Sequence, residues 1–166
     1  MNAEEENVFV NGKIRKETHK NGVEMGVAEL TLGRSFLIRV DHNADIVKFV
    51  AELAEKREIK VATFTVVGAL KRATLGFYDQ TTHKYLNLPV DSPSEVASCV
   101  GNISIKDGKP FVHMHAVLAD RNGNTKAGHL VEGTVFAAEV HLFELIGVKV
   151  ARKHDALTDL SLWVRK

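Results

Sequence analysis

The sequence contains a single cysteine, Cys99, among its 166 residues. An intrachain disulfide is therefore excluded, and we expect the core alone to hold the fold, as in proteins of a reducing compartment. No run of about 18 apolar residues occurs without a charge, so a membrane span is not expected. The amino terminus has acids at residues 4–6, where a secretory signal would be basic. These features predict a cytoplasmic location.

The chain also lacks an excess of charge of either sign. Lys and Arg total 22 against 21 Asp and Glu, which gives a formal net charge of +1. Proteins that bind nucleic acid electrostatically usually carry a basic excess, so the composition argues weakly against DNA binding. Apolar residues make up 45% and charged residues 26%, as is typical of a soluble globular protein of one domain.

Several common functional motifs are missing as well. There is no Walker loop, GxGxxG fingerprint, GxSxG elbow or papain-like cysteine motif, so neither nucleotide binding nor a serine or cysteine nucleophile is indicated. Cys99 is expected to be buried in a strand. The basic pairs Lys71-Arg72 and Arg152-Lys153 have no aromatic residues between them and predict solvated edges rather than a phosphate-binding track.

Residues 41–58 predict the one clear helix. Apolar residues recur there at spacings of three and four, and basic residues close the last turn, which complements the helix dipole. Asp41 or Asn43 is the expected N-cap, with Asp45 in the first turn. We place this helix at about residues 43–58.

Short β-rich segments fill most of the remaining chain. Turn residues predict hairpins that join 73–78 to 84–88, 95–105 to 111–119 through Asp107-Gly108, and 111–119 to 129–145 through Asn122-Gly123. The expected strands are 29–32, 36–40, 60–67, 73–78, 84–88, 95–105, 111–119, 129–145 and 160–164. A turn at Gly33-Arg34 would make the first two a hairpin, and Gly68 would end the third. This pattern predicts an α+β fold: a single compact domain with a largely antiparallel β-sheet, packed by the main helix and by shorter helical pieces.

The polar residues 1–22 are expected to be a loose N-terminal segment, or one peripheral hairpin around residues 8–10. The domain itself is then predicted to span residues 23–166.

Three of the eight histidines fall close together, at His113, His115 and His129. Alternate residues of a strand share a face, so His113 and His115 project the same way, with Cα atoms about 6.5 to 7 Å apart. A two-residue turn at 122–123 would place Leu130 opposite His115. One extra residue, or a bulge at Gly128, would place His129 there instead.

Three neutral imidazoles with an open fourth position are the usual ligands of a catalytic zinc ion, and such a set selects Zn²⁺ or a similar divalent metal. A His-x-His pair on a strand is also common as a solvent-facing or hydrogen-bonded pair, and both interpretations stay open from these residues alone. Glu132 and Asp120 flank the histidine hairpin. They are candidates for a general base or for orienting an imidazole, and surface charge would explain both equally.

The segment 108–116 (GKPFVHMHA), followed by Gly123 and by Gly128-His129-Leu130, resembles the PPC family, a domain conserved in plants and prokaryotes. The similarity extends over roughly residues 26–164. It implies a compact α+β domain, a homotrimer and, as in several prokaryotic members, a zinc-like metal held by His113, His115 and His129.

Plant members of that family carry AT-hooks and act as DNA-binding regulators. This chain has no Arg-Gly-Arg-Pro core of an AT-hook, so DNA as a partner is implied by the family alone. It also has Ala127 where the family usually has glycine.

Two functions follow as hypotheses. The first is a trimeric regulatory or DNA-binding-type module, or a module for a small-molecule ligand, with a divalent metal at the histidines. The second is a small zinc-dependent hydrolase or lyase that uses a metal-bound water.

Overall fold

Most of the chain forms one curled β-sheet. The computed structural model describes residues 14–18 and 24–163. The strands of this sheet are β3 (Thr31–Val40), β4 (Ala62–Asp79), β5 (Lys84–Val90), β6 (Ser94–Lys106), β7 (Lys109–Ala119), β8 (Thr125–Ile146), β9 (Ala151–Asp155) and β10 (Leu160–Trp163). Two further strands, β1 (Ile14–Thr18) and β2 (Glu24–Ala28), pair with each other in a separate antiparallel ladder.

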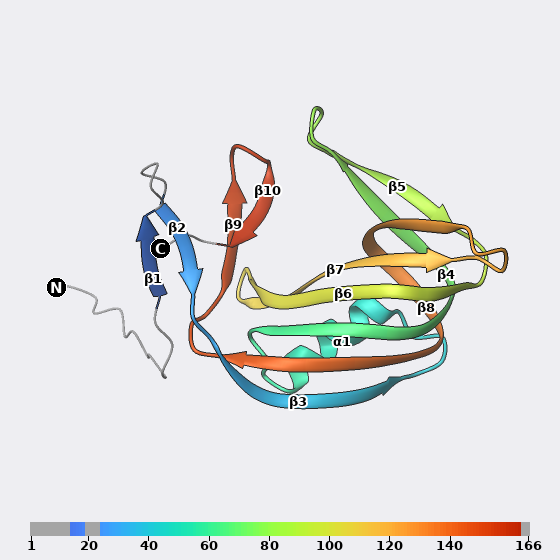
Figure 1. Ribbon diagram of the computed structural model, residues 1–166, viewed down its shortest axis with the longest axis horizontal. Helices are drawn as coiled ribbons and strands as arrows, with labels where there is room; N and C mark the ends of the chain where they lie inside the picture. Colours follow the sequence, from blue (N-terminus) through green and yellow to red (C-terminus); the bar gives the residue numbers. More distant parts are fainter. Residues whose placement is uncertain (1–13, 19–23, 164–166) are drawn as a thin grey trace.

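Strand β4 is the centre of the sheet. It pairs with β8 along most of its length, with β6 along its first half and with β5 along its second half. Because β6 also pairs with β7 and β7 with β8, the ladders lead back to β4 and the sheet curls round (Figure 1). Among the described strands every ladder is antiparallel except the short one between β6 and β9. The prediction of a largely antiparallel sheet in a single compact domain is therefore confirmed.

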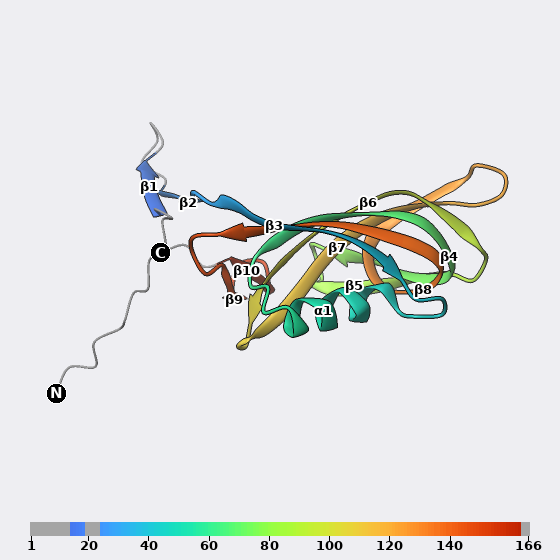
Figure 2. The same ribbon diagram turned by 90° about the horizontal axis from the view of Figure 1, so that it is seen from below.

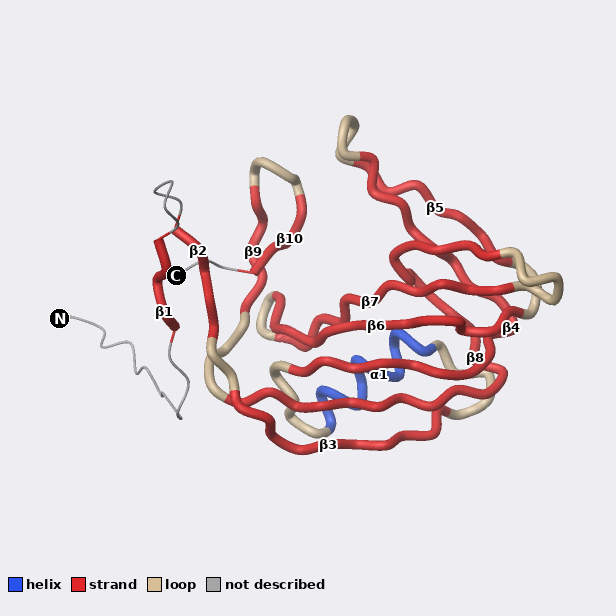
Figure 3. The backbone as a smooth tube through the Cα atoms, in the orientation of Figure 1, coloured by secondary structure: helices blue, strands red, loops and turns tan. Residues whose placement is uncertain are grey.

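Helix α1 (Ile46–Lys56) covers one face of the sheet, as the view from below shows (Figure 2). Its N-cap is Asp45, because this carboxylate accepts hydrogen bonds from the backbone N–H of Lys48 at 2.9 Å and of Gly133 in β8 at 3.0 Å. The expected caps Asp41 and Asn43 were wrong. Within the described ranges α1 is the only helix (Figure 3), so the predicted shorter helical pieces are not found there.

The core lies between α1 and the inner face of the sheet. Buried and exposed side chains alternate along the strands, so only one face of each strand contributes to it. The largest buried side chains are Phe64, Ile46, Ile59, Leu70, Leu75, Ile103, Met114, Leu118 and Leu142. The opposite face, which we call the open face, is left uncovered by the helix.

Two strand boundaries differ from the prediction. Gly33 and Arg34 lie within the continuous strand β3 as a bulge, because the two of them face the single residue Glu144 between the pairs Leu32–Leu145 and Ser35–Phe143. The Arg34 guanidinium bonds both carboxylate oxygens of Glu144 there, at 2.6 and 2.9 Å. Gly68 does not end a strand but lies within β4 at φ 141°. A Cβ at Gly68 would lie 2.2 Å from the carbonyl oxygen of Ala137, so glycine is needed here for β4 to approach the backbone of β8 this closely.

The predicted hairpins of β4 with β5, β6 with β7 and β7 with β8 are confirmed, and the last strand pairs with β9. The expected hairpin around residues 8–10 lies outside the described residues, and the domain boundary at residue 23 stays a prediction. Across the described part of the chain, no helix has the length and apolar character needed to cross a membrane.

Candidate metal site

The three histidines lie on the open face of the sheet. On β7 the residue between His113 and His115 is Met114, whose side chain is buried in the core, so alternation directs both imidazoles to the opposite side. On β8 the buried Leu130 follows His129 and places that ring on the open face by the same rule.

The hairpin between β7 and β8 sets the register of the cluster. Asp120 donates its backbone N–H to the Asn124 carbonyl at 2.9 Å, which leaves a three-residue loop with Gly123 at φ 82°. His115 therefore lies opposite His129. The ladder runs without a shift from this pair to the loop, so the extra residue is in the loop and the suggested bulge at Gly128 is absent.

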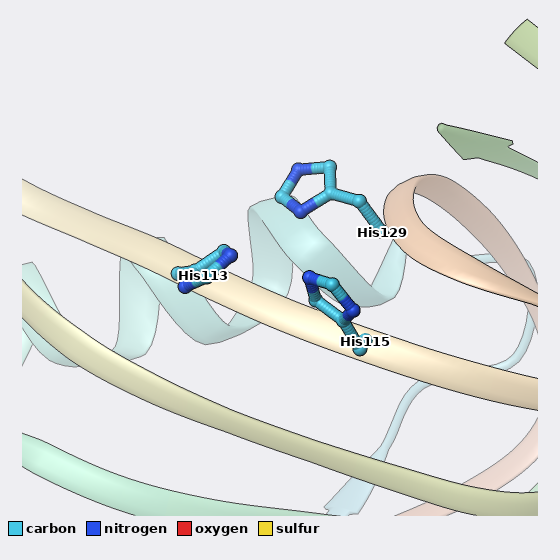
Figure 4. A group of neighbouring side chains, drawn as sticks. All are labelled: His113, His115 and His129. Atoms are coloured by element: carbon cyan, nitrogen blue, oxygen red, sulfur yellow. The ribbon is translucent and has the colours of Figure 1, made fainter. Parts of the chain in front are cut away.

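The three rings point toward one another (Figure 4). Each of them offers one nitrogen to a group whose ligand atoms all lie within 4.8 Å of one another. The ring centroids are separated by 5.2 Å for His113 and His115, 5.3 Å for His113 and His129, and 5.6 Å for His115 and His129. No Cys, Asp or Glu of the described residues joins this group.

The surroundings favour neutral imidazoles. Burial, with smaller contributions from Arg152 and the other two histidines, lowers the pKa of His113 to about 4. Burial and His115 also lower the pKa of His129. Neutral imidazole is the form that binds a metal ion, so both groups are ready to act as ligands at neutral pH.

The donor set fits a zinc-like ion. Nδ1 of His129 is buried and has no hydrogen-bond partner within the described part of the chain. An unpaired buried polar atom is costly, and a metal bound at the cluster, or a group ordered with it, would satisfy it. Three imidazole ligands without a thiolate match the sites at which zinc keeps a coordination position for a further ligand.

The two carboxylates proposed as acid or base candidates are used elsewhere. Asp120 accepts backbone N–H groups of Asn122 at 2.8 Å and of Asn124 at 2.9 Å, and the Asn124 side chain, together with these loop contacts, lowers its pKa. Glu132 is exposed and accepts the Thr74 hydroxyl at 2.8 Å. Neither belongs to the histidine group.

Two residues near the cluster were not predicted from the sequence to lie there. The Tyr85 ring of β5 lies 5.7 Å from the His129 ring, so the β4–β5 hairpin forms one side of the site. Arg152 is partly buried and hydrogen-bonded rather than part of a solvated edge. Only the long-range pairing of β9 with β6 places it here, so no local sequence signal could have identified it.

The buried thiol of Cys99 takes no part in this site. Burial raises its pKa to about 12, so the thiolate is scarce at neutral pH. The expectation that Cys99 is packed inside a strand is confirmed.

Gly128 holds His129 in place, and Gly128→Ala is expected to disturb the site. A Cβ at this position would lie 2.8 Å from the carbonyl oxygen of Gly76 in β4, so the backbone must move. Overpacking of this kind destabilises by about 1–3 kcal/mol, and thermal unfolding should show the loss. The exposed neighbour is the matched control: Ala127→Gly should change stability by less than about 1 kcal/mol. Equal stability of Gly128→Ala and the wild type would contradict the role of this close contact.

The chain is similar in sequence and fold to several known proteins. A family model of the Plants and Prokaryotes Conserved (PCC) domain matches residues 27–146. A metal-containing protein of Archaeoglobus fulgidus is 38% identical, with a TM-score of 0.82 over 84% of this chain and 99% of that chain. A plant- and prokaryote-conserved (PPC) protein of Pyrococcus horikoshii is 36% identical, with a TM-score of 0.81 over 84% and 97%.

A proposed DNA-binding protein of Ralstonia eutropha JMP134 is 25% identical, with a TM-score of 0.70 over 77% of this chain and 89% of that chain. A search of curated proteins found no match.

Proposed function

Because this chain belongs to the Plants and Prokaryotes Conserved family, we propose that it is a homotrimeric, ligand-binding module with one zinc-like divalent ion at His113, His115 and His129. The observation that carries the proposal is the convergence of three imidazoles, which each offer a ligand nitrogen within 4.8 Å of the others. Nδ1 of His129 is buried there and has no hydrogen-bond partner in the described part of the chain. The metal-containing relative from Archaeoglobus fulgidus, 38% identical, supports it. When bound, such an ion supplies a Lewis-acidic centre for a further ligand.

The open face supports self-association. Leu37, Val67, Val100 and Phe143 are all exposed there, each beside a strand neighbour that faces the core. Exposed apolar side chains that gather on one face favour an interaction surface. Val100 lies opposite His115 in the β6–β7 ladder, so a subunit interface on this face would lie next to the histidine cluster.

A binding function is favoured over hydrolysis or lyase chemistry because the described part of the chain supplies no free acid or base at the cluster. Asp120 and Glu132 are engaged in other contacts, and the group of metal-ligating side chains consists of the three histidines without a carboxylate. DNA binding belongs to the proposed role of a relative, and the net charge of +1 offers little electrostatic support for it here. A single buried cysteine suits a reducing compartment, so we propose the cytoplasm.

Zinc titration at several pH values tests this function. We expect tag-free, chelator-treated protein to bind about one zinc per chain at pH 7. Protons compete with zinc for neutral imidazoles, so the affinity should fall as the pH decreases. Because the pKa of His113 lies at about 4, protonation of this ring adds to the loss of affinity only as the pH approaches 4. The absence of zinc uptake at pH 7, or complete loss of affinity already above pH 6, would contradict the proposal.

A further inference from the structure

One arginine lies beside the histidine cluster with only neutral acceptors. Arg152 of β9 donates from Nε to the Ser104 hydroxyl at 2.8 Å, from Nη2 to the Asn102 side-chain oxygen at 3.0 Å and from Nη1 to the Ser161 carbonyl at 3.0 Å. Among residues 28–163, whose side chains the structure describes, no carboxylate forms an ion pair with it. A half-buried positive charge is thus held in place without a negative counterpart.

The position of Arg152 is fixed relative to the cluster. Its acceptor Asn102 lies directly opposite His113 in the β6–β7 ladder. Its Cζ lies 5.2 Å from the ring of Phe111, which precedes His113 by two residues on the same strand and therefore on the same face. The charge is close enough to contribute to the lowered pKa of His113, after burial.

Two donors of the guanidinium are left over. Of its five N–H groups, three are used in the bonds to Ser104, Asn102 and Ser161. One N–H on each terminal nitrogen has no acceptor in the described part of the chain. Arginine presents such donors in a planar arrangement that matches the two oxygens of a carboxylate.

We propose that Arg152 and the metal ion at the three histidines together bind the carboxylate group of a small organic acid. This inference rests on the proposed function, since it needs the ion. A metal cation at the cluster and the nearby guanidinium of Arg152 would repel each other, and an anion bound to both replaces repulsion with attraction. The three-histidine set leaves the ion a position for one carboxylate oxygen, while Arg152 donates to the carboxylate from the other side. Metal and acid therefore bind cooperatively.

Calorimetric titration of zinc-loaded protein with acetate and succinate tests the proposal. Compared with the wild type, Arg152→Gln should bind both acids about 10- to 100-fold more weakly, as expected for losing charge-assisted hydrogen bonds. Arg39→Gln, which removes an exposed arginine of β3, is the matched control and should bind them unchanged. Inorganic phosphate is titrated in parallel as the competing anion, and the proposal requires that it not bind more tightly than the acids.

Equal acid affinities of Arg152→Gln and the wild type would overturn the proposal, as would tighter binding of phosphate than of the acids.

Because Arg152 also connects the β9–β10 hairpin to β6, two further variants separate the effect of its charge from the effect of the hairpin's position. Ser104→Ala removes one tie but keeps the guanidinium, and should retain the affinity. Arg152→Lys keeps the charge without the planar donors and should be intermediate. If Ser104→Ala and Arg152→Lys lost acid affinity to the same extent, the position of the β9–β10 hairpin alone would determine binding, which would contradict the proposal. A wild type without zinc would refute the metal site itself, which metal analysis detects before any acid is added.

Discussion

Replacing His129 by alanine is expected to reduce the metal content of the purified protein from about one ion per chain to nearly none. The ring of His129 faces both other imidazoles, and without it only two neighbouring ligands on β7 remain. The loss of an outer-shell partner typically weakens metal affinity 10- to 100-fold, and the loss of a direct ligand should exceed about 100-fold. Elemental analysis and zinc titration measure both quantities.

His141→Ala is the matched control for this variant. His141 also lies on β8, where it pairs with Leu37 of β3 and Thr65 of β4, but it is not part of the histidine group. The control should retain its metal. If His129→Ala kept one ion per chain, or if His141→Ala lost it equally, the assignment of the ligands would be wrong.

The second large effect concerns assembly. If the chain forms the proposed homotrimer, the double variant Leu37→Glu, Val100→Glu is expected to be monomeric under conditions in which the wild type is trimeric. Leu37 is 82% exposed and Val100 56% exposed, on the open face of the sheet. Burying two carboxylates without partners in an interface costs several kcal/mol each, which is more than a trimer contact of ordinary size tolerates. Light scattering should report a mass near the 18.3 kDa of one chain instead of three times that value.

Leu157→Glu provides the control for the assembly prediction. Leu157 is 84% exposed in the turn between β9 and β10, so the substitution adds the same charge away from the open face. This variant should remain trimeric. A wild type that is monomeric at micromolar concentration, or a double variant that stays trimeric, would contradict the proposed interface.

Local patterns predicted the parts of the fold that local physics determines. The helix was found because its apolar stripe of Ile46, Val50 and Ala54 repeats at helical spacing and packs on the sheet as expected. The hairpins around Asn122-Gly123 and Asp107-Gly108 were predicted because Asn-Gly and Asp-Gly pairs favour turns that need a positive φ angle, and both glycines adopt one.

Long-range contacts decided the features that the sequence could not reveal. Gly33-Arg34 has the composition of a turn, but pairing with β8 continues on both sides of it, and Arg34 forms an ion pair with Glu144, 110 residues away. Asp45 became the helix cap because it also binds Gly133 of β8. In both cases a tertiary partner overrides the local preference.

The candidate site likewise contains residues that local patterns predict and one residue that only long-range pairing places there. His113 and His115 share a face by simple alternation, whereas the sequence allowed either an extra loop residue or a bulge at Gly128 to bring His129 opposite His115. Arg152 reaches the cluster only through the pairing of β9 with β6 and its bond to Asn102. Its sequence neighbourhood, with Lys153 beside it, gives no sign of that position.

Anomalous diffraction at the zinc absorption edge, from crystals of tag-free protein prepared without chelator, tests the metal site most directly. We predict one peak per chain at about 2.0 to 2.1 Å from a nitrogen of each of His113, His115 and His129. A crystal soaked in zinc that shows no peak between these imidazoles, or a peak bound to other side chains only, would contradict the metal site.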